Sequence, residues 1–240
     1  MLNVTEPFST THVCSCLRIY NPTISLLCSS GSLAKREYMA PLEVKFHSLD
    51  FRNVLHWKCQ PRAPNNLQYF VEYKVYGNKH WTACKRCQGI LKHQCDLSQE
   101  TSDPRQWYYA RVQAVSSKNP SSWVISSRFH PQWETTFSPP QIRLNVTEEG
   151  IVVQIRPPRS PLRGQKNTRI SVTELQQLRF KIYLMQNGVE EQIHEMECQS
   201  QKVVIQVFEP TTTYCFQAIT IMPLSGRLSR KSPSTCITTP

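Results

Sequence analysis

The segment Pro210-Thr-Thr-Thr-Tyr-Cys215 lies near the end of the chain, and Cys236 follows it just before the C-terminus. A proline, a tyrosine four positions later and two cysteines that can close one hairpin are typical of a disulfide-linked corner in a β-sandwich. We expect the tyrosine ring to be buried and its hydroxyl to bond to upstream backbone. A similar arrangement, Tyr108-Tyr109 followed by Ala-Arg-Val-Gln-Ala-Val, ends the first half of the chain. The chain is therefore predicted to contain two related β-modules.

Length and composition are those of a folded chain with room for two domains. The 240 residues are 39% hydrophobic, which is enough for packed cores. Only 7 glycines are present, against 17 prolines. This balance argues against glycine-rich phosphate-binding loops and favours many short strands. The formal charge is 28 − 17 = +11, but the basic residues are scattered, which is more typical of a soluble surface than of a polyanion site.

Apolar and polar residues alternate with a period of two along much of the chain after Pro41. Such alternation is typical of half-buried β-strands. It covers residues 42–47, 71–75 and 109–114 in the first half, where Val54-Leu-His-Trp57 adds a strand with a core tryptophan. In the second half, strands are expected at 142–146, 151–155, 180–184, 202–207 and 214–221. The prediction is an all-β protein with two tandem immunoglobulin-like β-sandwiches joined by an elbow.

Composition shifts divide the chain into four segments. We expect a poorly defined leader at 1–40, the first sandwich at 41–130, a stiff linker with two adjacent prolines at 131–140, and the second sandwich at 141–240. Three local features are predicted within the second sandwich. They are a long loop at 156–172, a capped helical turn starting at Ser171-Val-Thr-Glu174, and a solvated turn at Glu190-Glu191.

Ten cysteines indicate an oxidising compartment. Cys87 and Cys95 are predicted to pin a short connection between strands, and Cys215 and Cys236 to join the last two strands. In the chain-entropy model such loops stabilise the fold by roughly 2.5–3.5 kcal/mol each. Cys59 and Cys84 are candidates for a third disulfide. The pairing of Cys14, Cys16, Cys28, Cys59, Cys84 and Cys198 does not follow from the sequence.

A zinc site is the competing interpretation of the same cysteines. Cys84-x-x-Cys87, followed by His93 and Cys95, offers the ligand types that zinc prefers. The four residues are compressed into twelve positions among sandwich strands, so disulfides are the favoured interpretation and no metal or other cofactor is expected.

The sequence contains no motif of a known catalytic centre. A nucleophile elbow, a His-Glu-x-x-His pair, an acidic calcium loop and a P-loop are all missing, so an enzyme is not expected. No apolar run approaches the roughly 20 residues that cross a bilayer. The sequons at Asn3 and Asn145 are compatible with a secreted glycoprotein. Function is expected on loops, such as the turn at Tyr76-Gly77 and the exposed segment Met222-Pro-Leu224.

Several motifs in order resemble the class II cytokine receptors. In the first module these are Glu72-Tyr-Lys-Val-Tyr-Gly77 with Trp81, Cys87-x7-Cys95-Asp-Leu-Ser-x-Glu-Thr101, and Tyr108-Tyr-Ala-Arg-Val. The second module adds Ser171-Val-Thr-Glu-Leu-Gln-Gln-Leu178 and the cysteine pair at its end. The resemblance covers about residues 41–240 and is greatest to the interleukin-20 and interleukin-22 receptor group.

The resemblance implies two fibronectin type III domains set at an angle, with loops at the elbow that grip a helical cytokine. The cytokine would belong to the interleukin-10 family, with interleukin-22 as the first choice. The cytokine-binding residues would be Lys74, Tyr76, Gly77, Lys79, Glu100, Thr101, Ser102, Met222, Pro223 and Leu224, and less securely Pro158 to Arg163.

The resemblance also carries an expectation about the kind of receptor. Only four residues follow Cys236, so we expect a soluble, secreted, monomeric decoy that binds no nucleic acid. Two alternatives stay open. One is the ectodomain of a membrane-bound signalling subunit, and the other is a zinc- or polyanion-binding protein that uses the positive charge.

Overall fold

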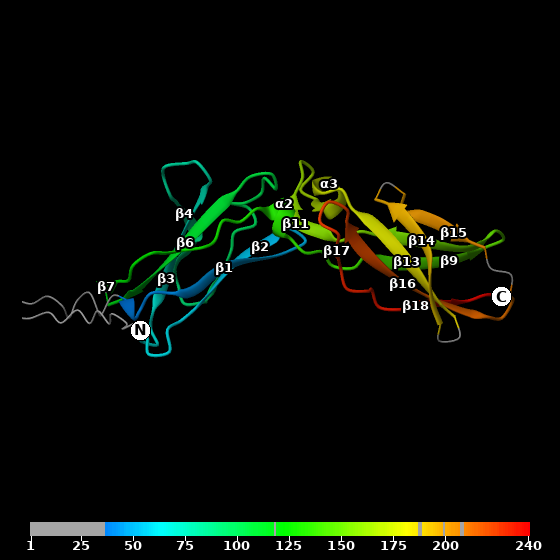
Figure 1. The fold of residues 1–240 in the computed structure, drawn as a ribbon, viewed down its shortest axis with the longest axis horizontal. Coiled ribbons are helices and arrows are strands. Elements are labelled where there is room, and N and C mark those ends of the chain that lie inside the picture. The colour runs from blue at the N-terminus through cyan, green and yellow to red at the C-terminus, as the bar shows by residue number, and fades with distance from the viewer. Residues whose placement is uncertain (1–36, 118, 187–188, 199, 207–208) are drawn as a thin grey trace, which may run out of the picture.

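The computed structural model describes residues 37–240, apart from residues 118, 187–188, 199 and 207–208. The described chain forms two β-sandwiches placed end to end, with a short helix between them, in an elongated molecule (Figure 1). The predicted all-β class and the tandem arrangement are therefore confirmed. Among the described residues, no helix combines the length and apolar character needed to cross a bilayer.

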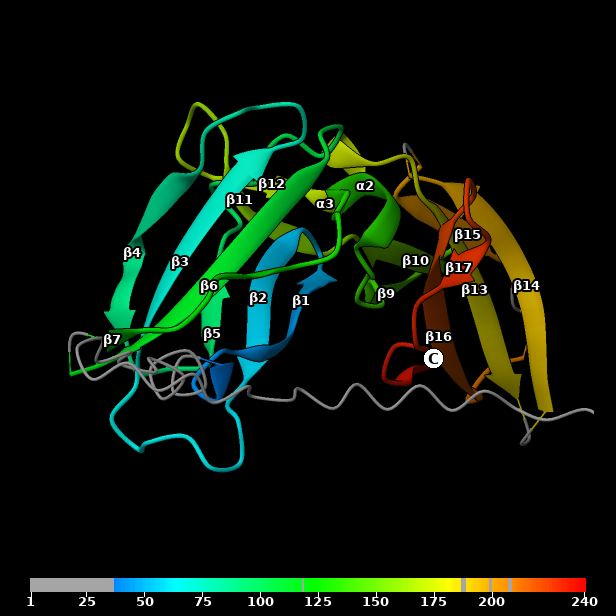
Figure 2. The same ribbon diagram turned by 60° about the vertical axis from the view of Figure 1, so that its left-hand side comes forward.

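The first sandwich packs two antiparallel sheets face to face. Its elements are β1 (Leu42–Leu49), β2 (Arg52–Lys58), β3 (Gln68–Val75), β4 (Thr82–Ile90), β5 (Gln94–Asp96), β6 (Tyr108–Ser116), β7 (Asn119–Pro120) and β8 (Val124–Ile125). One sheet has the order β1-β2-β5, and the other has the order β4-β3-β6-β7 with β8 on β6. Figure 2 shows the layer of β4, β3 and β6 in front of the layer of β1 and β2.

The second sandwich repeats this plan and adds a two-stranded ribbon. Its elements are β9 (Gln141–Thr147), β10 (Gly150–Arg156), β11 (Arg159–Arg163), β12 (Arg169–Ser171), α3 (Val172–Leu175), β13 (Arg179–Gln186), β14 (Val189–Glu197), β15 (Lys202–Ile205), β16 (Thr213–Met222), β17 (Arg227–Leu228) and β18 (Thr235–Thr238). One sheet has the order β15-β10-β9, and the other has the order β14-β13-β16-β17 with β18 on β16. Within the described part of the chain, the strands β11 and β12 pair only with each other.

The predicted alternation places apolar side chains in two cores. On β6 the residues Ala110, Val112 and Ala114 are buried, while their neighbours are half-buried. The predicted core tryptophan, Trp57, is buried in the same cluster. This core extends beyond the expected start of the sandwich, because Met39 is only 3% exposed and packs into it. The other residues expected to form a leader, 1–36, lie outside the described residues.

The two disulfides that the structure describes have different positions in their sandwiches. Cys87 on β4 and Cys95 on β5 belong to opposite sheets, so their bond connects the two layers of the first sandwich. Cys215 and Cys236 are direct cross-strand partners on β16 and β18, so their bond lies within one sheet. Cys59, Cys84 and Cys198 are free. The expected third bond between Cys59 and Cys84 is therefore wrong.

Local structure differs from the sequence-based prediction in three other places. The predicted loop at 156–172 holds the ribbon β11–β12, and the predicted turn at Glu190-Glu191 lies inside β14. The expected linker contains the helix α2 (Pro131–Glu134), which begins with a proline at its first position, where a missing N–H costs nothing. The helix cap at Ser171 is confirmed as a capping box with Glu174.

A third apolar cluster lies at the elbow between the sandwiches. It consists of Phe51 from the β1–β2 turn, Phe137 from the linker, and Val172, Leu178 and Met222 from the second sandwich. All five side chains are buried, so the hydrophobic effect favours the bent arrangement over separated sandwiches.

Hydrogen bonds reinforce the elbow cluster. The carboxylate of Asp50 accepts bonds from the backbone N–H and the hydroxyl of Ser138, at 2.9 and 2.6 Å. The hydroxyl of Thr220 donates to the carbonyl of Ser138 at 3.0 Å. One linker residue is thus bonded to both sandwiches, which limits their relative rotation.

The expected tyrosine bond is found in the first sandwich. The hydroxyl of Tyr108 donates to the carbonyl of Asp103 at 3.0 Å, and burial raises the pKa of Tyr108 to about 12. The ring of Tyr214 is buried as predicted, but within the described part of the chain its hydroxyl has no hydrogen bond.

We predict that Tyr108→Phe destabilises the first sandwich by about 1 kcal/mol, because the variant loses one buried hydrogen bond and keeps the ring. Urea unfolding followed by tryptophan fluorescence measures this loss. The matched control is Tyr214→Phe, which we expect to change the free energy of unfolding by less. Equal losses in the two variants would contradict the assignment of the bond.

Candidate functional site

The turn after β3 presents an exposed aromatic side chain on a fixed backbone. The backbone N–H of Tyr76 donates to the carbonyl of Trp107 at 2.7 Å, and that of Asn78 donates to the carbonyl of Val75 at 3.1 Å. Gly77 has a φ of +90°, a conformation that other residues rarely adopt. Its absent side chain faces open space. The ring of Tyr76 is 56% exposed above this turn.

Tyr76 belongs to a row of aromatic and arginine side chains, which we call the aromatic row. Its members are Tyr109, Tyr76, Arg128, Trp107, His130 and Trp133. The guanidinium of Arg128 lies 5.5 Å from the ring centroid of Tyr76 and 4.1 Å from that of Trp107. The arginine thus contacts two rings, an arrangement in which cation–π attraction orders the side chains.

The aromatic row continues through the linker to the second sandwich. The rings of Trp107 and His130 meet edge to face at 4.5 Å, and His130 lies 6.3 Å from Trp133 on α2. The guanidinium of Arg227, on β17, donates to the carbonyl of Trp133. Trp133 itself is 47% exposed. A chain of contacts therefore runs from the Tyr76 turn through the buried His130 to Trp133 and on to Arg227 of the second sandwich.

The expected contact residues of the β16–β17 turn differ in exposure. Met222 is 1% exposed and belongs to the elbow cluster, so the prediction of an exposed Met-Pro-Leu segment is wrong for this residue. Pro223 is exposed, and Leu224 is 60% exposed. The turn is closed by a bond from the backbone N–H of Gly226 to the carbonyl of Met222 at 2.9 Å. This arrangement leaves Leu224 as an exposed apolar side chain of the turn.

The loop at residues 98–103 supplies less free surface than expected. Thr101 is 1% exposed, and its hydroxyl accepts a bond from the side-chain amide of Asn53 at 2.7 Å. The carboxylate of Glu100 forms an ion pair with Arg86 at 2.8 Å. Burial thus removes Thr101 from any contact surface, and Glu100 is engaged with a neighbour. Ser102 is exposed.

Two expected lysines flank the Tyr76 turn in different settings. Lys79 is exposed. Lys74 lies over Trp81, with its ammonium 4.8 Å from the ring centroid. On the other side, the guanidinium of Arg111 lies 4.4 Å from the ring centroids of both Trp81 and Trp123. Arg111 also donates to the carboxylate of Glu72 at 2.7 Å, so this stack of cations and rings is fixed to the sheet.

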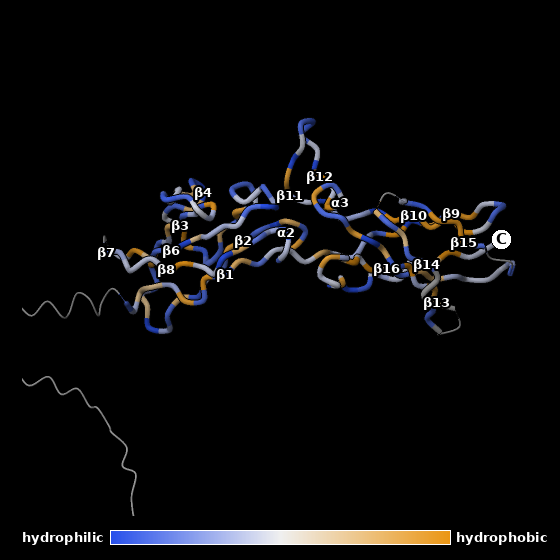
Figure 3. The backbone as a smooth tube through the Cα atoms, turned by 45° about the horizontal axis from the view of Figure 1, so that its top comes forward, coloured by the Kyte–Doolittle hydropathy of each residue, from blue (hydrophilic) through white to orange (hydrophobic). Residues whose placement is uncertain are grey.

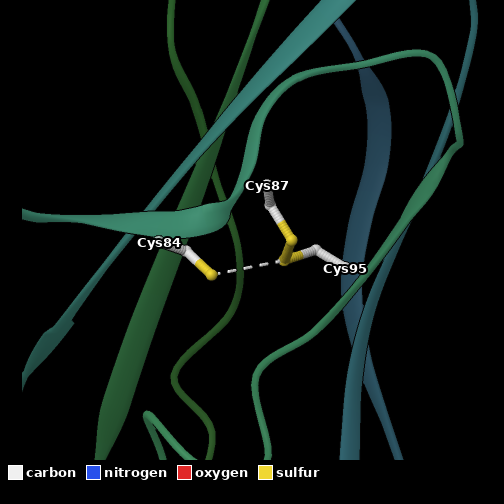
Figure 4. A group of neighbouring side chains, drawn as sticks. All are labelled: Cys84, Cys87 and Cys95. Atoms are coloured by element: carbon white, nitrogen blue, oxygen red, sulfur yellow. Dashed lines mark hydrogen bonds between the residues drawn. A yellow bond between two sulfur atoms is a disulfide. The ribbon is translucent and has the colours of Figure 1, made fainter.

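The cysteines of the proposed zinc site do not form a metal centre. The sulfurs of Cys84, Cys87 and Cys95 lie within 4.8 Å of one another (Figure 4). Two of them are joined in the disulfide, and the free sulfur of Cys84 lies 3.8 Å from that of Cys95. The expected fourth ligand, His93, packs edge to face against Tyr69 at 5.2 Å. Because zinc binds thiolates, these residues do not fit the ion while the disulfide is present.

Cys84 is instead a buried thiol. Burial raises its pKa, and the negative charge of Glu100 adds to this effect. The other free cysteine of this sandwich, Cys59, lines a separate cleft with Tyr69 and His93.

The residues that sequence analysis missed are the aromatic ones. The contacts of Trp107, Tyr109 and Trp133 within the aromatic row were not expected, although Trp133 follows the first sandwich in a segment rich in aromatic and proline residues. A tryptophan in a segment expected to be a linker was the feature of the sequence that could have indicated this row. The sequon at Asn145 lies on β9, where the asparagine is exposed and accessible to modification.

Comparisons with known proteins match both halves of the chain. A family model described as Tissue factor matches residues 17–123, and one described as Interferon-alpha/beta receptor, fibronectin type III, matches residues 135–240. The interleukin-22 receptor subunit alpha-2 of Mus musculus is 33% identical over 90% of this chain and 95% of that protein. The interleukin-20 receptor subunit alpha of Mus musculus is 30% identical over 83% of this chain and 37% of that protein.

A solved structure supports the fold. The chicken interferon gamma receptor alpha chain has a TM-score of 0.65 at 21% identity, over 85% of this chain and 99% of that chain. Two fibronectin type III domains in tandem are thus the architecture of this protein.

His130, inside the aromatic row, generates a prediction about pH. Burial lowers its pKa below the ordinary value of 6.5, and its Nδ1 has no hydrogen-bond partner among the described residues. As the pH falls through 6.5, this histidine becomes protonated in the unfolded chain while it stays neutral in the folded chain. The free energy of unfolding therefore decreases as the pH is lowered.

We expect His130→Gln to weaken this pH dependence between about pH 7.5 and 5. Urea unfolding at several pH values measures it. The control is His80→Gln, because His80 is exposed and its removal is expected to leave the pH dependence unchanged. An unchanged slope in the His130 variant would contradict the prediction.

Proposed function

The chain belongs to the class II cytokine receptor family, and we propose that it is a secreted receptor that binds a helical cytokine and blocks its signalling as a decoy. The cytokine is of the interleukin-10 family, with interleukin-22 as the first choice. The proposed ligand draws support from the mouse relative named interleukin-22 receptor subunit alpha-2, which is matched over 95% of its length.

The single observation that carries the proposal is the position of Tyr76. An exposed aromatic ring on a turn fixed by hydrogen bonds loses little conformational entropy on binding. Tyrosine, tryptophan and arginine are also the residue types enriched among binding hot spots. Tyr76 is therefore the proposed anchor of the cytokine, with Lys79 and Ser102 as polar residues at the rim of the contact.

A specific interface buries about 800 Å² on each partner, more than one turn can supply. The aromatic row extends the contact from Tyr76 to Trp133 on α2, and Leu224 of the β16–β17 turn adds a point on the second sandwich. A rigid elbow holds these parts in one arrangement before the cytokine arrives. We propose that the helical cytokine lies across the elbow and contacts both sandwiches.

The decoy mechanism is competition. A receptor that covers the cytokine surface used by a signalling receptor prevents that contact by occupancy alone. The second candidate function is that of the ectodomain of a signalling subunit, which the 30% identity to the interleukin-20 receptor subunit alpha supports.

We predict that Tyr76→Ala weakens interleukin-22 binding by about 2 kcal/mol or more, mainly through faster dissociation. Surface plasmon resonance with immobilised chain measures the effect. The matched control is Leu91→Ala, which removes a side chain that is also exposed but lies on the β4–β5 connection, outside the aromatic row. If dissociation is unchanged while the fold is intact, Tyr76 is not the anchor.

A second experiment tests the decoy role. Purified chain is added to cells that respond to interleukin-22, and the response is recorded over a series of cytokine concentrations. We expect a parallel shift of the response curve to higher cytokine concentration, as competition requires. Interleukin-20 and interleukin-10 serve as comparison ligands in the binding assay. Tight binding without inhibition would rule out the decoy role and favour a signalling subunit.

A further inference from the structure

One face of the second sandwich carries basic side chains without acidic partners. On the outward side of the sheet β15-β10-β9 these are Arg143, Arg156 and Lys202, where Arg143 and Lys202 are the cross-strand neighbours of Gln154. The ribbon β11–β12 and its tip add Arg159, Arg163, Lys166 and Arg169. No acidic residue occurs in the sequence from Gly150 to Thr173. We call these seven side chains the basic face.

On the opposite sheet of the same sandwich, acidic side chains neutralise several of the basic ones. There Arg179 pairs with Glu195 and Glu197, Lys181 pairs with Glu195, and Lys231 pairs with Glu190. None of the seven residues of the basic face forms an ion pair with any residue that the structure describes. The positive charge of the second sandwich is therefore concentrated on one side.

Two arginines of the ribbon repel each other. Arg163 and Arg169 are direct cross-strand partners and both are exposed. Like charges in this position destabilise a strand pair. The inward side of the ribbon packs as a normal strand does, because Ser160 and Leu162 are buried. The fold thus needs only the inward residues, and the repulsion outside would be relieved by a bound anion.

A cleft connects the ribbon to the sheet. It has a volume of about 710 Å³ and is lined by Arg156 from β10 together with Arg159 and Arg169 from the ribbon. The acid in its lining, Asp50, is held by two hydrogen bonds from Ser138. Figure 3 shows the ribbon standing out from the body of the molecule with a hydrophilic tip. The cleft and the projecting ribbon together form an elongated positive surface.

We infer that the basic face binds a linear sulfated polysaccharide. Guanidinium groups present paired donors that match planar oxyanion geometry, and several of them in a row suit a repeating anion better than a single ion. Five of the seven side chains are arginines. The disulfides place the chain in an oxidising compartment, where sulfated polysaccharides are the abundant linear polyanions. Such binding would hold a secreted receptor near cell surfaces, and it is additional to cytokine binding.

The test is chromatography of the whole purified chain on immobilised heparin, with affinities from titration by heparin oligosaccharides at several salt concentrations. The variant Arg159→Gln/Arg163→Gln/Arg169→Gln should elute at lower salt, with affinity reduced about tenfold or more. Its plot of log affinity against log salt should be shallower by roughly one per arginine that contacts a sulfate. A second variant, Arg156→Gln/Lys202→Gln, changes the sheet alone and should show the same direction of effect.

The matched control removes three charges elsewhere. Arg62, Lys85 and Lys92 of the first sandwich are exposed and form no ion pair within the described part of the chain, so Arg62→Gln/Lys85→Gln/Lys92→Gln has the same net charge as the ribbon variant. We expect it to elute close to the unaltered chain. Fully desulfated heparin should bind none of the proteins. Asn145 lies on the same side of β9 as Arg143. Measurements before and after enzymatic removal of N-glycans show whether a glycan at Asn145 reduces access of heparin to the basic face.

Three results would overturn the proposal. The first is failure of the unaltered chain to be retained at physiological salt, and the second is elution of the ribbon variant together with the control. In the third, the ribbon variant loses interleukin-22 binding while its heparin retention is unchanged, which would make the ribbon a cytokine contact. Because cytokine binding is measured on the same variants, failure of this proposal and failure of the proposed function are distinguishable.

Discussion

Burial of Met222 against Phe51 and Phe137 is the interaction on which the rest of the structure depends. Each residue comes from a different part of the chain, so their contact fixes the two sandwiches and the linker together. Ser138 extends this constraint by bonding to Asp50 on one side and Thr220 on the other. Because the elbow is packed and not merely tethered, a surface that crosses it keeps one shape. A partner that contacts both sandwiches therefore meets a preorganised surface and orders few residues on binding.

The two sides of this protein present different chemistry for the same architectural reason. A sandwich strand commits alternate residues to the core and leaves the others to solvent, so the outward residues are free to specialise. In the first sandwich and the linker, aromatic rings and Arg128 form a row of contacts in which Tyr76 and Trp133 are exposed. In the second, the outward residues of β9, β10 and β15 are basic or neutral, whereas those of β13 and β14 form ion pairs. Selection for a partner can act on each side without disturbing either core.

Local pattern predicted the strands well and the surface poorly. Alternation along β6, β10 and β16 reflects which face of each strand is buried, and that is a property of neighbouring residues. The ribbon at 159–171 was predicted as a loop because prolines and arginines mask its alternation. Thr101 was expected as a contact from the family resemblance and Met222 from its place in a loop, yet Thr101 is buried with a bond from Asn53 and Met222 is buried in the elbow cluster. A position in a loop does not determine whether a side chain faces solvent or the protein interior.

The amino-acid sequence was sufficient to predict the all-β class, the tandem sandwiches, the cysteine pairs and the family. Periodicity, spacing and the order of motifs are properties of the linear sequence. The free state of Cys84, the aromatic row from Tyr76 to Trp133 and the basic face became visible only with the fold. Each depends on contacts between segments far apart in the chain. Cys84 lies beside a disulfide that connects two sheets, Trp133 reaches Trp107 through His130, and Arg169 lies opposite Arg163. Burial, charge pairing and shared surfaces are properties of packed segments, and packing is set by the three-dimensional arrangement.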